Sequence, residues 1–475
     1  MSIQIRTSLT HVAGTFLIHA AGASLNGAAL GEGEGRNVAV PKTFSDGRNQ
    51  VPYVSAQAWR RWLRTTAVQE GSWPASELQA IGWNSKGNVN KVAGQLNPVE
   101  FPEDDIFGYM RAQSGHDRRR VATEDEDEQG EFDTKTRSVM RASPFAASLL
   151  VSLRSNGWRG EDEGFVHLTR YDPEALAEAQ VERFLRSASE GNYESKKDVW
   201  RRLESFGQEW AAEVRSAATE PNFEKLLGLL SAKGNEKHKE VRFIGNATSP
   251  LPYATRFYNT HLQGVFCLDY SRLGVFWNLG DRVELEEKQT RKFLDQKMIV
   301  DVTCDQGYQA LTQNGRLGRV YRMVDIGRVR KERAGVLLKA LAVLRGGANQ
   351  AQFGTDIAPK VLVLAGLTCG NPIFNHLFED STQGPKLKIE PFKEIIRDYA
   401  SRIVTPVLVG MRSGYLGNEC DVRALGGWWK LTQKGQSSGT ASLEGPSTTS
   451  AEDHSIEVRV MTPVEAARHI GDRLP

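Results

Sequence analysis

One short predicted helix carries the side chains best suited to bind a polyanion. Residues 47–64 read GRNQVPYVSAQAWRRWLR, and Ser55 is placed to cap a helix after an extended stretch. At about 3.6 residues per turn, the helix has an apolar side and a basic side. The apolar side holds Trp59, Trp62 and Leu63, and the basic side holds Arg60, Arg61 and Arg64. Because arginine presents a planar fork of donors that fits phosphate, the basic side is a candidate cradle for a nucleic-acid backbone. The alternative is a basic side that is simply exposed to solvent and binds nothing. Considered without the rest of the chain, the helix favours this alternative.

A second candidate site follows a longer amphipathic helix predicted over residues 327–346. After Arg345 come two glycines, an alanine, Asn349 and Gln350. Two glycines permit close approach of the backbone to a ligand, and the two amide side chains can hydrogen-bond to phosphate or sugar. The alternative is a plain helix C-cap with polar residues behind it, and the segment alone does not separate the two interpretations.

Catalytic patterns are weak in this sequence. Glu103, Asp104 and Asp105 could bind a metal ion, but no histidine or second acidic motif accompanies them at a defined spacing. Acidic turns of this kind usually lie in solvent or cap a helix. A P-loop lysine is missing, and the four cysteines are too widely spaced for a zinc knuckle. We therefore expect no enzyme activity, no metal site and no cofactor.

The composition limits the classes of partner. The chain has 475 residues, 40% of them hydrophobic and 25% charged, which suggests roughly three domains or one domain with large insertions. Its formal net charge of +2 is small, so any polyanion site must be local. No apolar run approaches the length of a membrane span, and unpaired cysteines suit a reducing compartment. We expect a cytoplasmic protein without membrane contact.

The order of predicted elements indicates an α+β fold. A strand over residues 2–20 precedes the first helix, a buried strand follows within 138–153, and strands at 260–268 and 272–277 are joined by a tight turn. The second helix and an apolar strand at 360–367 complete the order strand, helix, strand, strand, helix, strand, which is the ferredoxin-like βαββαβ pattern. Residues 172–239 are predicted to be helical, with their aromatic side chains in a core.

Five blocks, in this order, resemble the DevR-type backbone subunit of type I CRISPR-associated surveillance complexes (Cascade). They are VPYVSAQAWRRWLR at 51–64, FPEDDIFGYM at 101–110, RASPFAASLLVSL at 141–153, LPYATRFYNTHLQGVFCLDY at 251–270 and RGGANQAQFGTDIAPKVLVLA at 345–365. With the segments between them they span most of residues 2–426. The charged loop at 118–131, the helical stretch at 172–239 and the tail after 435 have no counterpart in the resemblance.

The resemblance implies a modified RNA-recognition (RRM-like) palm with finger, thumb and helical insertions. We expect a discontinuous palm core at 1–70, 138–155 and 258–370, a finger-type insertion with a charged loop at 71–137, a thumb region with a helical insertion at 156–257, the C-terminal part of the core at 371–434, a flexible linker at 435–454 and a terminal strand and helix at 455–475.

The function implied is non-catalytic. Copies of the subunit would oligomerise along a CRISPR guide RNA as a helical filament, bind other subunits of the complex, and present the guide for pairing with target DNA. The expected RNA contacts are Lys42, Arg48, Gln57, Arg60, Arg61, Arg64, Arg345, Asn349 and Gln350, with Arg60 and Arg64 favoured over Arg61. Phe165 or Leu168 could wedge beside a displaced base. The competing hypothesis is a metal-dependent ribonuclease that uses Asp104 or Asp105.

Overall fold

The computed structural model describes the chain in two compact units. The described residues are 9–25, 29–30, 38–76, 79–83, 89–111, 138–166, 177, 180–182, 184–185, 201–219, 223–236, 252–280, 282–348, 354–433, 441–447 and 455–475. One unit comprises Met1–Ala29, Val40–Glu161 and Arg256–Pro475, and the other comprises Leu30–Ala39 and Asp162–Thr255. Together the elements are of the α+β class, as the sequence predicts.

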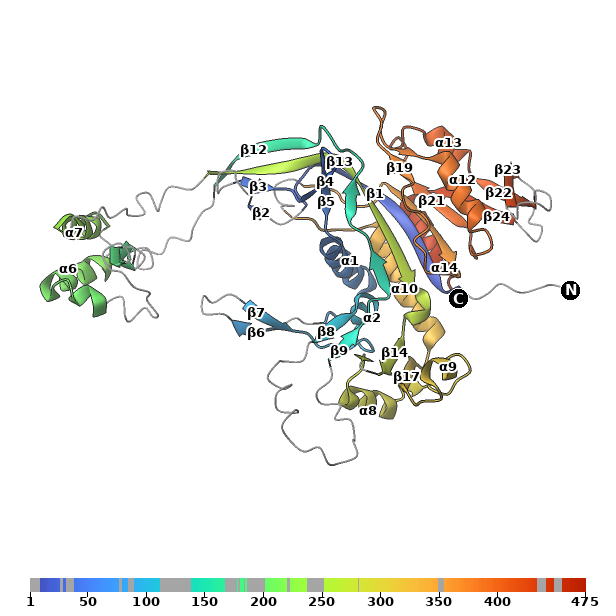
Figure 1. The fold of residues 1–475 in the computed structure, drawn as a ribbon, viewed down its shortest axis with the longest axis horizontal. Helices are drawn as coiled ribbons and strands as arrows, with labels where there is room; N and C mark the ends of the chain where they lie inside the picture. Colours follow the sequence, from blue (N-terminus) through green and yellow to red (C-terminus); the bar gives the residue numbers. More distant parts are fainter. Residues whose placement is uncertain are drawn as a thin grey trace. The chain divides into compact units, whose positions relative to one another are not determined.

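A large mixed sheet forms the centre of the first unit (Figure 1). Its middle strands run in the order β18-β1-β13-β11, and each neighbouring pair is antiparallel. These are β18 (Val361–Leu367), β1 (His11–Ala23), β13 (Pro252–Asp269) and β11 (Leu150–Ser152). Further strands extend both edges: β5 (Asn49–Val54) and β4 (Thr43–Asp46) beyond β11, and β21 (Val407–Met411), β24 (Ser455–Met461), β22 (Gly427–Gln433) and β23 (Ala441–Ser447) beyond β18. Strand β10 (Phe145–Ala147) also pairs with β13.

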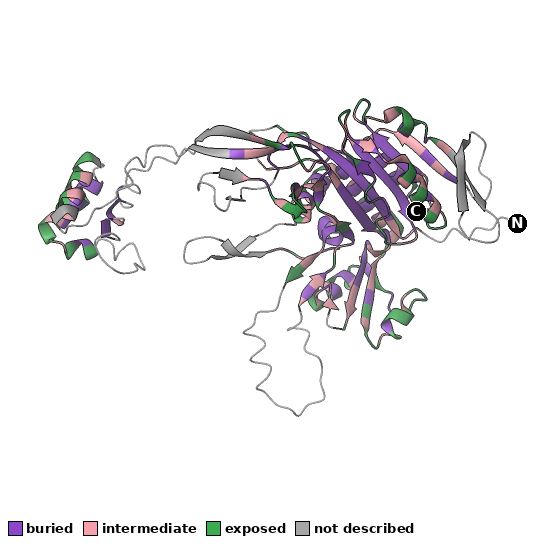
Figure 2. Cartoon of the chain, turned by 45° about the horizontal axis from the view of Figure 1, so that its top comes forward, coloured by how far each residue is buried: buried purple, intermediate pink, exposed green. Residues whose placement is uncertain are grey.

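Helices cover both faces of this sheet, because alternate strand residues are apolar on each side. On one face, α1 (Ala56–Gly71), α10 (Ile326–Ala342) and α14 (Pro463–Arg473) share a buried core with Phe16 of β1 and Phe266 of β13. On the other face, α12 (Ile389–Asp398) and α13 (Glu419–Arg423) share a second core with Leu17 and Val363. Figure 2 shows the buried centre of the sheet and helices.

A smaller sheet of six strands belongs to the same unit. Its order is β16 (Ile299–Asp301), β17 (Gly318–Met323), β14 (Val275–Leu279), β15 (Arg282–Val283), β9 (Val139–Arg141) and β8 (Tyr109–Arg111). The short helices α2 (Pro102–Phe107), α8 (Glu287–Asp295), α9 (Gln309–Thr312) and the 3-10 turn η2 (Tyr270–Arg272) accompany it. The strands predicted at 260–268 and 272–277 therefore belong to different sheets, since η2 redirects the chain between them.

The second unit contains helices α6 (Gln208–Thr219) and α7 (Phe223–Glu236), which confirms the helical prediction over the described part of 172–239. Phe184 and Leu203 are fully buried there, and Phe206 and Trp210 pack against them, so these aromatic residues are core residues. The remaining strands of the chain are β2 (Ala29–Leu30), β3 (Val38–Val40), β12 (Arg159–Val166), β6 (Gln79–Trp83), β7 (Val89–Ala93), β19 (Phe378–Glu379) and β20 (Lys386–Leu387).

Two predicted boundaries differ from the observed ones. Helix α10 ends at Ala342 rather than at Gly346, because Val343 already leaves the helical conformation. Residues 441–447, expected within a linker, instead form β23, which pairs along β22. The predicted capping box of the last helix is confirmed, with Thr462 and Glu465 each bonded to the other's backbone. None of the helices in the described residues is long and apolar enough to cross a membrane.

Candidate functional site

Helix α1 is anchored by its aromatic side. The side chain of Ser55 accepts a hydrogen bond from the Ala58 amide, so the predicted N-cap is confirmed. Trp59 and Leu63 are fully buried, and Trp59 Nε1 donates to the Ser148 carbonyl at 2.7 Å. Burial of one complete side fixes which residues of α1 face outward.

The three arginines of α1 have different environments. Arg64 Nε and Nη2 lie 2.5 Å from Glu103 and 2.9 Å from Asp104, and its side chain is 25% exposed. Burial opposes its charge, but the hydrogen bond to Glu103 and the two nearby carboxylates raise the pKa of Arg64. Arg60 is half-buried, donates to the Phe107 carbonyl at 3.0 Å, and has its pKa lowered by desolvation. Both side chains thus bind α2.

The remaining candidates near α1 are exposed. Gln57 and Arg61 lie on the outer side of the helix, and Lys42 and Arg48 flank the strand β4, whose hairpin with β5 leads into α1. Within the described parts of the chain, no hydrogen bond or ion pair engages any of these four side chains. They are the candidate donors available to a ligand in solvent.

The loop after α10 lies against the end of α1. Arg345 Nη1 donates to Gln69 at 3.0 Å, and its other terminal nitrogen pairs with Glu70. The Arg345 backbone amide donates to Thr66 Oγ1 at 3.1 Å. Gly346 adopts φ of 141°, and a Cβ added there would lie 2.5 Å from Cγ of Trp62. Glycine at this position therefore permits close packing on Trp62, whereas the predicted approach of the backbone to a ligand stays a prediction.

Several predicted residues cannot be placed in the site. Asn349, Gln350 and Leu168 lie outside the described residues, and Phe165 belongs to β12 without a described side chain. Their expected roles therefore stay predictions.

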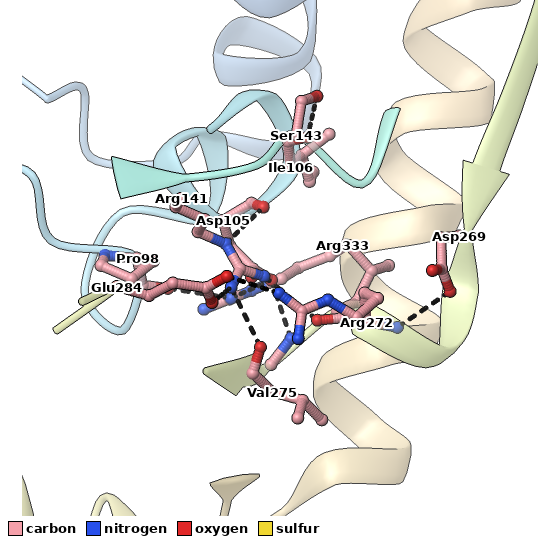
Figure 3. Close-up of polar contacts among 12 residues, drawn as sticks. Pro98, Asp105, Ile106, Arg141, Ser143, Asp269, Arg272, Val275, Glu284 and Arg333 are labelled. Carbon is pink, nitrogen blue, oxygen red and sulfur yellow. Dashed lines mark hydrogen bonds and ion pairs between the residues drawn. The ribbon is translucent and has the colours of Figure 1, made fainter. Parts of the chain in front are cut away.

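The acidic segment of α2 is buried and bound by arginines. Asp105 is fully buried, and its carboxylate accepts hydrogen bonds from Arg141, from Arg333 Nη1 at 2.5 Å and from the Gly274 amide at 3.0 Å (Figure 3). Glu103 and Asp104 both accept from Arg64. The expectation that such acidic turns lie in solvent is wrong here.

A fourth carboxylate completes this network. Glu284 is fully buried and accepts from Arg141 Nη1 at 2.7 Å and from Arg272 Nη2 at 2.6 Å. The ion pairs form two groups along α2: Arg64 pairs with Glu103 and Asp104, and Arg141, Arg272 and Arg333 pair with Asp105 and Glu284. Asp104 and Asp105 are adjacent in α2, and over both groups four arginines compensate four carboxylates, as burial in a low-dielectric interior requires.

This pairing leaves little room for a metal ion at α2. Desolvation raises the pKa of Asp104, although the Asn97 amide and Arg64 oppose the shift. The carboxylate of Asp105 is already bound by Arg141 and Arg333. The described residues contain no group of three or more histidine, cysteine or acidic side chains arranged to hold a metal. The role that the geometry supports is structural: the acidic side chains of α2 bind Arg64 of α1, Arg333 of α10 and Arg141 of the smaller sheet.

Sequence reasoning missed Arg141, Glu284 and Arg333 because most of their partners are distant in the chain: Arg141 and Arg333 bind Asp105 from 36 and 228 positions away, and Arg141 binds Glu284 from 143 positions away. One signal was present. Arg141 opens the largely apolar stretch RASPFAASLLVSL, whereas Arg333 follows the charged run RVRKE and carries no such signal. A charge that must be buried needs a buried counter-charge.

Comparisons with known proteins add limited information. No protein-family model matches the sequence, and no curated protein matches it. One similar solved chain is described as a CRISPR RNA-guided surveillance complex, pre-nicking, with 9% identity, a TM-score of 0.36, and coverage of 98% of this chain and 100% of that chain. Another, a CRISPR RNA-guided surveillance complex, has 10% identity, a TM-score of 0.30 and coverage of 82% and 83%. TM-scores at this level correspond to a loose overall match.

Proposed function

We propose that this chain is a non-catalytic CRISPR RNA-binding backbone subunit that oligomerises along a guide RNA and presents it for pairing with target DNA. The proposal rests on the five ordered sequence blocks and on what the first block becomes. Residues 51–64 form the end of β5 and the start of α1, which buries Trp59 and exposes Gln57 and Arg61. That division is what a helix needs if it is both a core element and a phosphate-binding surface.

The strand order supports an RRM-like palm as the scaffold. Antiparallel neighbours β18-β1-β13-β11, with α1 and α10 in one shared core, follow the arrangement of a βαββαβ ferredoxin-like unit. Because the same fold serves many functions, the fold alone does not argue for RNA binding. That part of the proposal depends on the exposed side chains of Lys42, Arg48, Gln57 and Arg61, which can donate hydrogen bonds to phosphate.

Within this proposal, we assign RNA contact to Arg61 rather than Arg64. The guanidinium of Arg64 already binds two carboxylates of α2, whereas that of Arg61 is exposed and has no polar partner among the described residues. Lys42, Arg48 and Gln57 are the accompanying donors. The ribonuclease alternative is less favoured, because Asp104 and Asp105 are held by arginines.

The test compares Arg61→Ala with Arg64→Ala in full-length protein bound to guide RNA. Removing one arginine that binds a phosphate of single-stranded RNA makes the slope of log K against log salt shallower by about 0.7. We expect this change in Arg61→Ala, with an unchanged unfolding midpoint. Arg64→Ala should mainly destabilise the fold. An unchanged salt slope in Arg61→Ala, together with normal filaments by electron microscopy, would reject the assignment.

A further inference from the structure

One face of the smaller sheet contains hydrogen-bond donors that the fold leaves unused. Buried nitrogen atoms of three side chains lack an acceptor among the described residues: Arg272 Nη1, Trp277 Nε1 and Arg322 Nε. A buried donor without an acceptor costs free energy, so native structures almost always give it a partner. Three on one surface call for a common explanation.

The three side chains are neighbours. In the antiparallel register of β14 and β17, Val275 faces Arg322 and Trp277 faces Val320. Facing residues share a side of the sheet, so Trp277 and Arg322 are diagonal neighbours on it. The guanidinium carbon of Arg272 lies 3.5 Å from the centroid of the Trp277 ring, a stacked cation–π contact. The indole of Trp277 and the guanidinium of Arg272 are thus in contact, and Arg322 lies on the same side of these strands as a diagonal neighbour.

The charge of this region is positive. Among the described residues, Arg272 pairs with one carboxylate, that of Glu284, which it shares with Arg141. Arg322 adds a charge that no carboxylate offsets within the described residues. Arg330 on α10 donates to the carbonyls of Leu273 and Ser271, next to Arg272, and forms no ion pair within the part of the chain that the structure describes. Desolvation lowers the pKa of Arg272, in keeping with an incomplete set of partners.

We propose that Arg272, Trp277 and Arg322 form a binding site for a phosphate group. The missing partner must be an acceptor, must be anionic, and must accept from several directions. A phosphate has more oxygen atoms than a carboxylate and suits the planar fork of arginine. Trp277 and Arg322 are each partly exposed although their orphan nitrogens are buried, so an anion from solvent can reach them. The site is separate from the donors of α1, and it does not depend on guide-RNA binding.

Two variants remove donors and keep an apolar side chain in place of each. Trp277→Phe keeps an aromatic ring under Arg272 but deletes the indole N–H, and Arg322→Met keeps the aliphatic length but deletes the guanidinium. The matched control is Arg319→Met. Arg319 lies on the same strand as Arg322 but on the opposite face, 57% exposed and 3.9 Å from Asp301. The control removes the same charge without touching the site.

The first measurement titrates the full chain with inorganic phosphate and records the thermal unfolding temperature at each concentration. Sodium chloride at equal ionic strength is the reference. We expect phosphate to raise the unfolding temperature of the wild type and of Arg319→Met. In Trp277→Phe and Arg322→Met the fitted Kd should rise at least about tenfold, as expected when one hydrogen bond to a charged ligand is removed. Arg322→Met should also be at least as stable as the wild type without phosphate, since it removes an unpaired charge.

A second titration with a short single-stranded RNA identifies the source of the phosphate. Competition between RNA and inorganic phosphate that disappears in Arg322→Met would assign the site to nucleic-acid phosphate, whereas binding of inorganic phosphate alone would assign it to a small phosphorylated ligand. The proposal is overturned if phosphate acts no more strongly than chloride, which would mean that water alone satisfies the three donors. It is equally overturned if both site variants respond to phosphate as the control does.

Discussion

Replacing Asp105 with asparagine tests whether the acidic segment of α2 is structural. The substitution keeps the size of the side chain but removes its charge and places an amide N–H₂ among donors. Asp105 is fully buried, and its two oxygens accept from Arg141, Arg333 and the Gly274 amide. Because the carboxylate is fully buried, water cannot readily replace it as the acceptor for these three donors.

The expected loss of unfolding free energy is large. Removing one partner of a buried ion pair typically costs about 3–5 kcal/mol, because the other charge is left without compensation. Here two arginines lose the same partner, and the side chain of Arg141 has no exposed surface. Against a total stability of about 5–15 kcal/mol for a typical protein, this change approaches the limit of a folded chain.

Urea unfolding followed by tryptophan fluorescence measures the effect. Asp356→Asn is the matched control, because Asp356 is 66% exposed and its ion pair with Lys360 is expected to contribute at most about 1 kcal/mol. Adding Arg333→Met to Asp105→Asn should restore part of the loss, since it removes one uncompensated charge. If Asp105→Asn were as stable as the wild type, the structural interpretation would fail. A catalytic role would then regain support, because catalytic residues are commonly replaced without loss of stability.

Two further changes test other contacts. Gly346→Ala places a Cβ 2.5 Å from Cγ of Trp62 at a positive φ, so we expect at least about 2 kcal/mol of destabilisation in urea, and a smaller effect would mean that the loop moves freely. Burial and the stacked His19 lower the pKa of His261 to about 4, below the unfolded value of about 6.5. Its neutral form therefore stabilises the fold above pH 6.5, and up to about 3 kcal/mol is lost as pH falls towards 4. The variant His261→Gln should lose less stability than the wild type between pH 7 and pH 4, and parallel pH profiles would contradict this.

The core elements were predictable because their patterns are local. A Ser55 cap, aromatic residues at helical spacing and an unbroken apolar run at 361–367 each specify one element without knowledge of the rest. The last helix was equally clear from its capping box at Thr462. Such signals depend on neighbours within a few positions.

The polar network was not predictable in the same way. Nothing within the sequence FPEDDIF distinguishes a solvated acidic turn from a buried one, because its partners Arg141 and Arg333 come from distant elements. Helical periodicity also placed Arg64 with Arg61 on one basic side, although α2 covers only part of that side. The position at which a second element packs against a helix depends on residues that are distant in the sequence. Here the packing of α2 on α1 changed the interpretation of each arginine.

The contacts of Arg64 and Trp59 hold the backbone of α1 in place beneath the exposed side chain of Arg61. A surface arginine on an isolated helix loses much side-chain and helix entropy on binding a phosphate, which reduces the affinity. Here Arg64 ties α1 to α2 through two carboxylates, and Trp59 ties it to the sheet. The helix bearing Arg61 is therefore rigid before any ligand arrives. If the chain binds guide RNA as proposed, Arg64→Ala should weaken that binding indirectly, in proportion to its loss of stability and without the change in salt slope expected for Arg61→Ala.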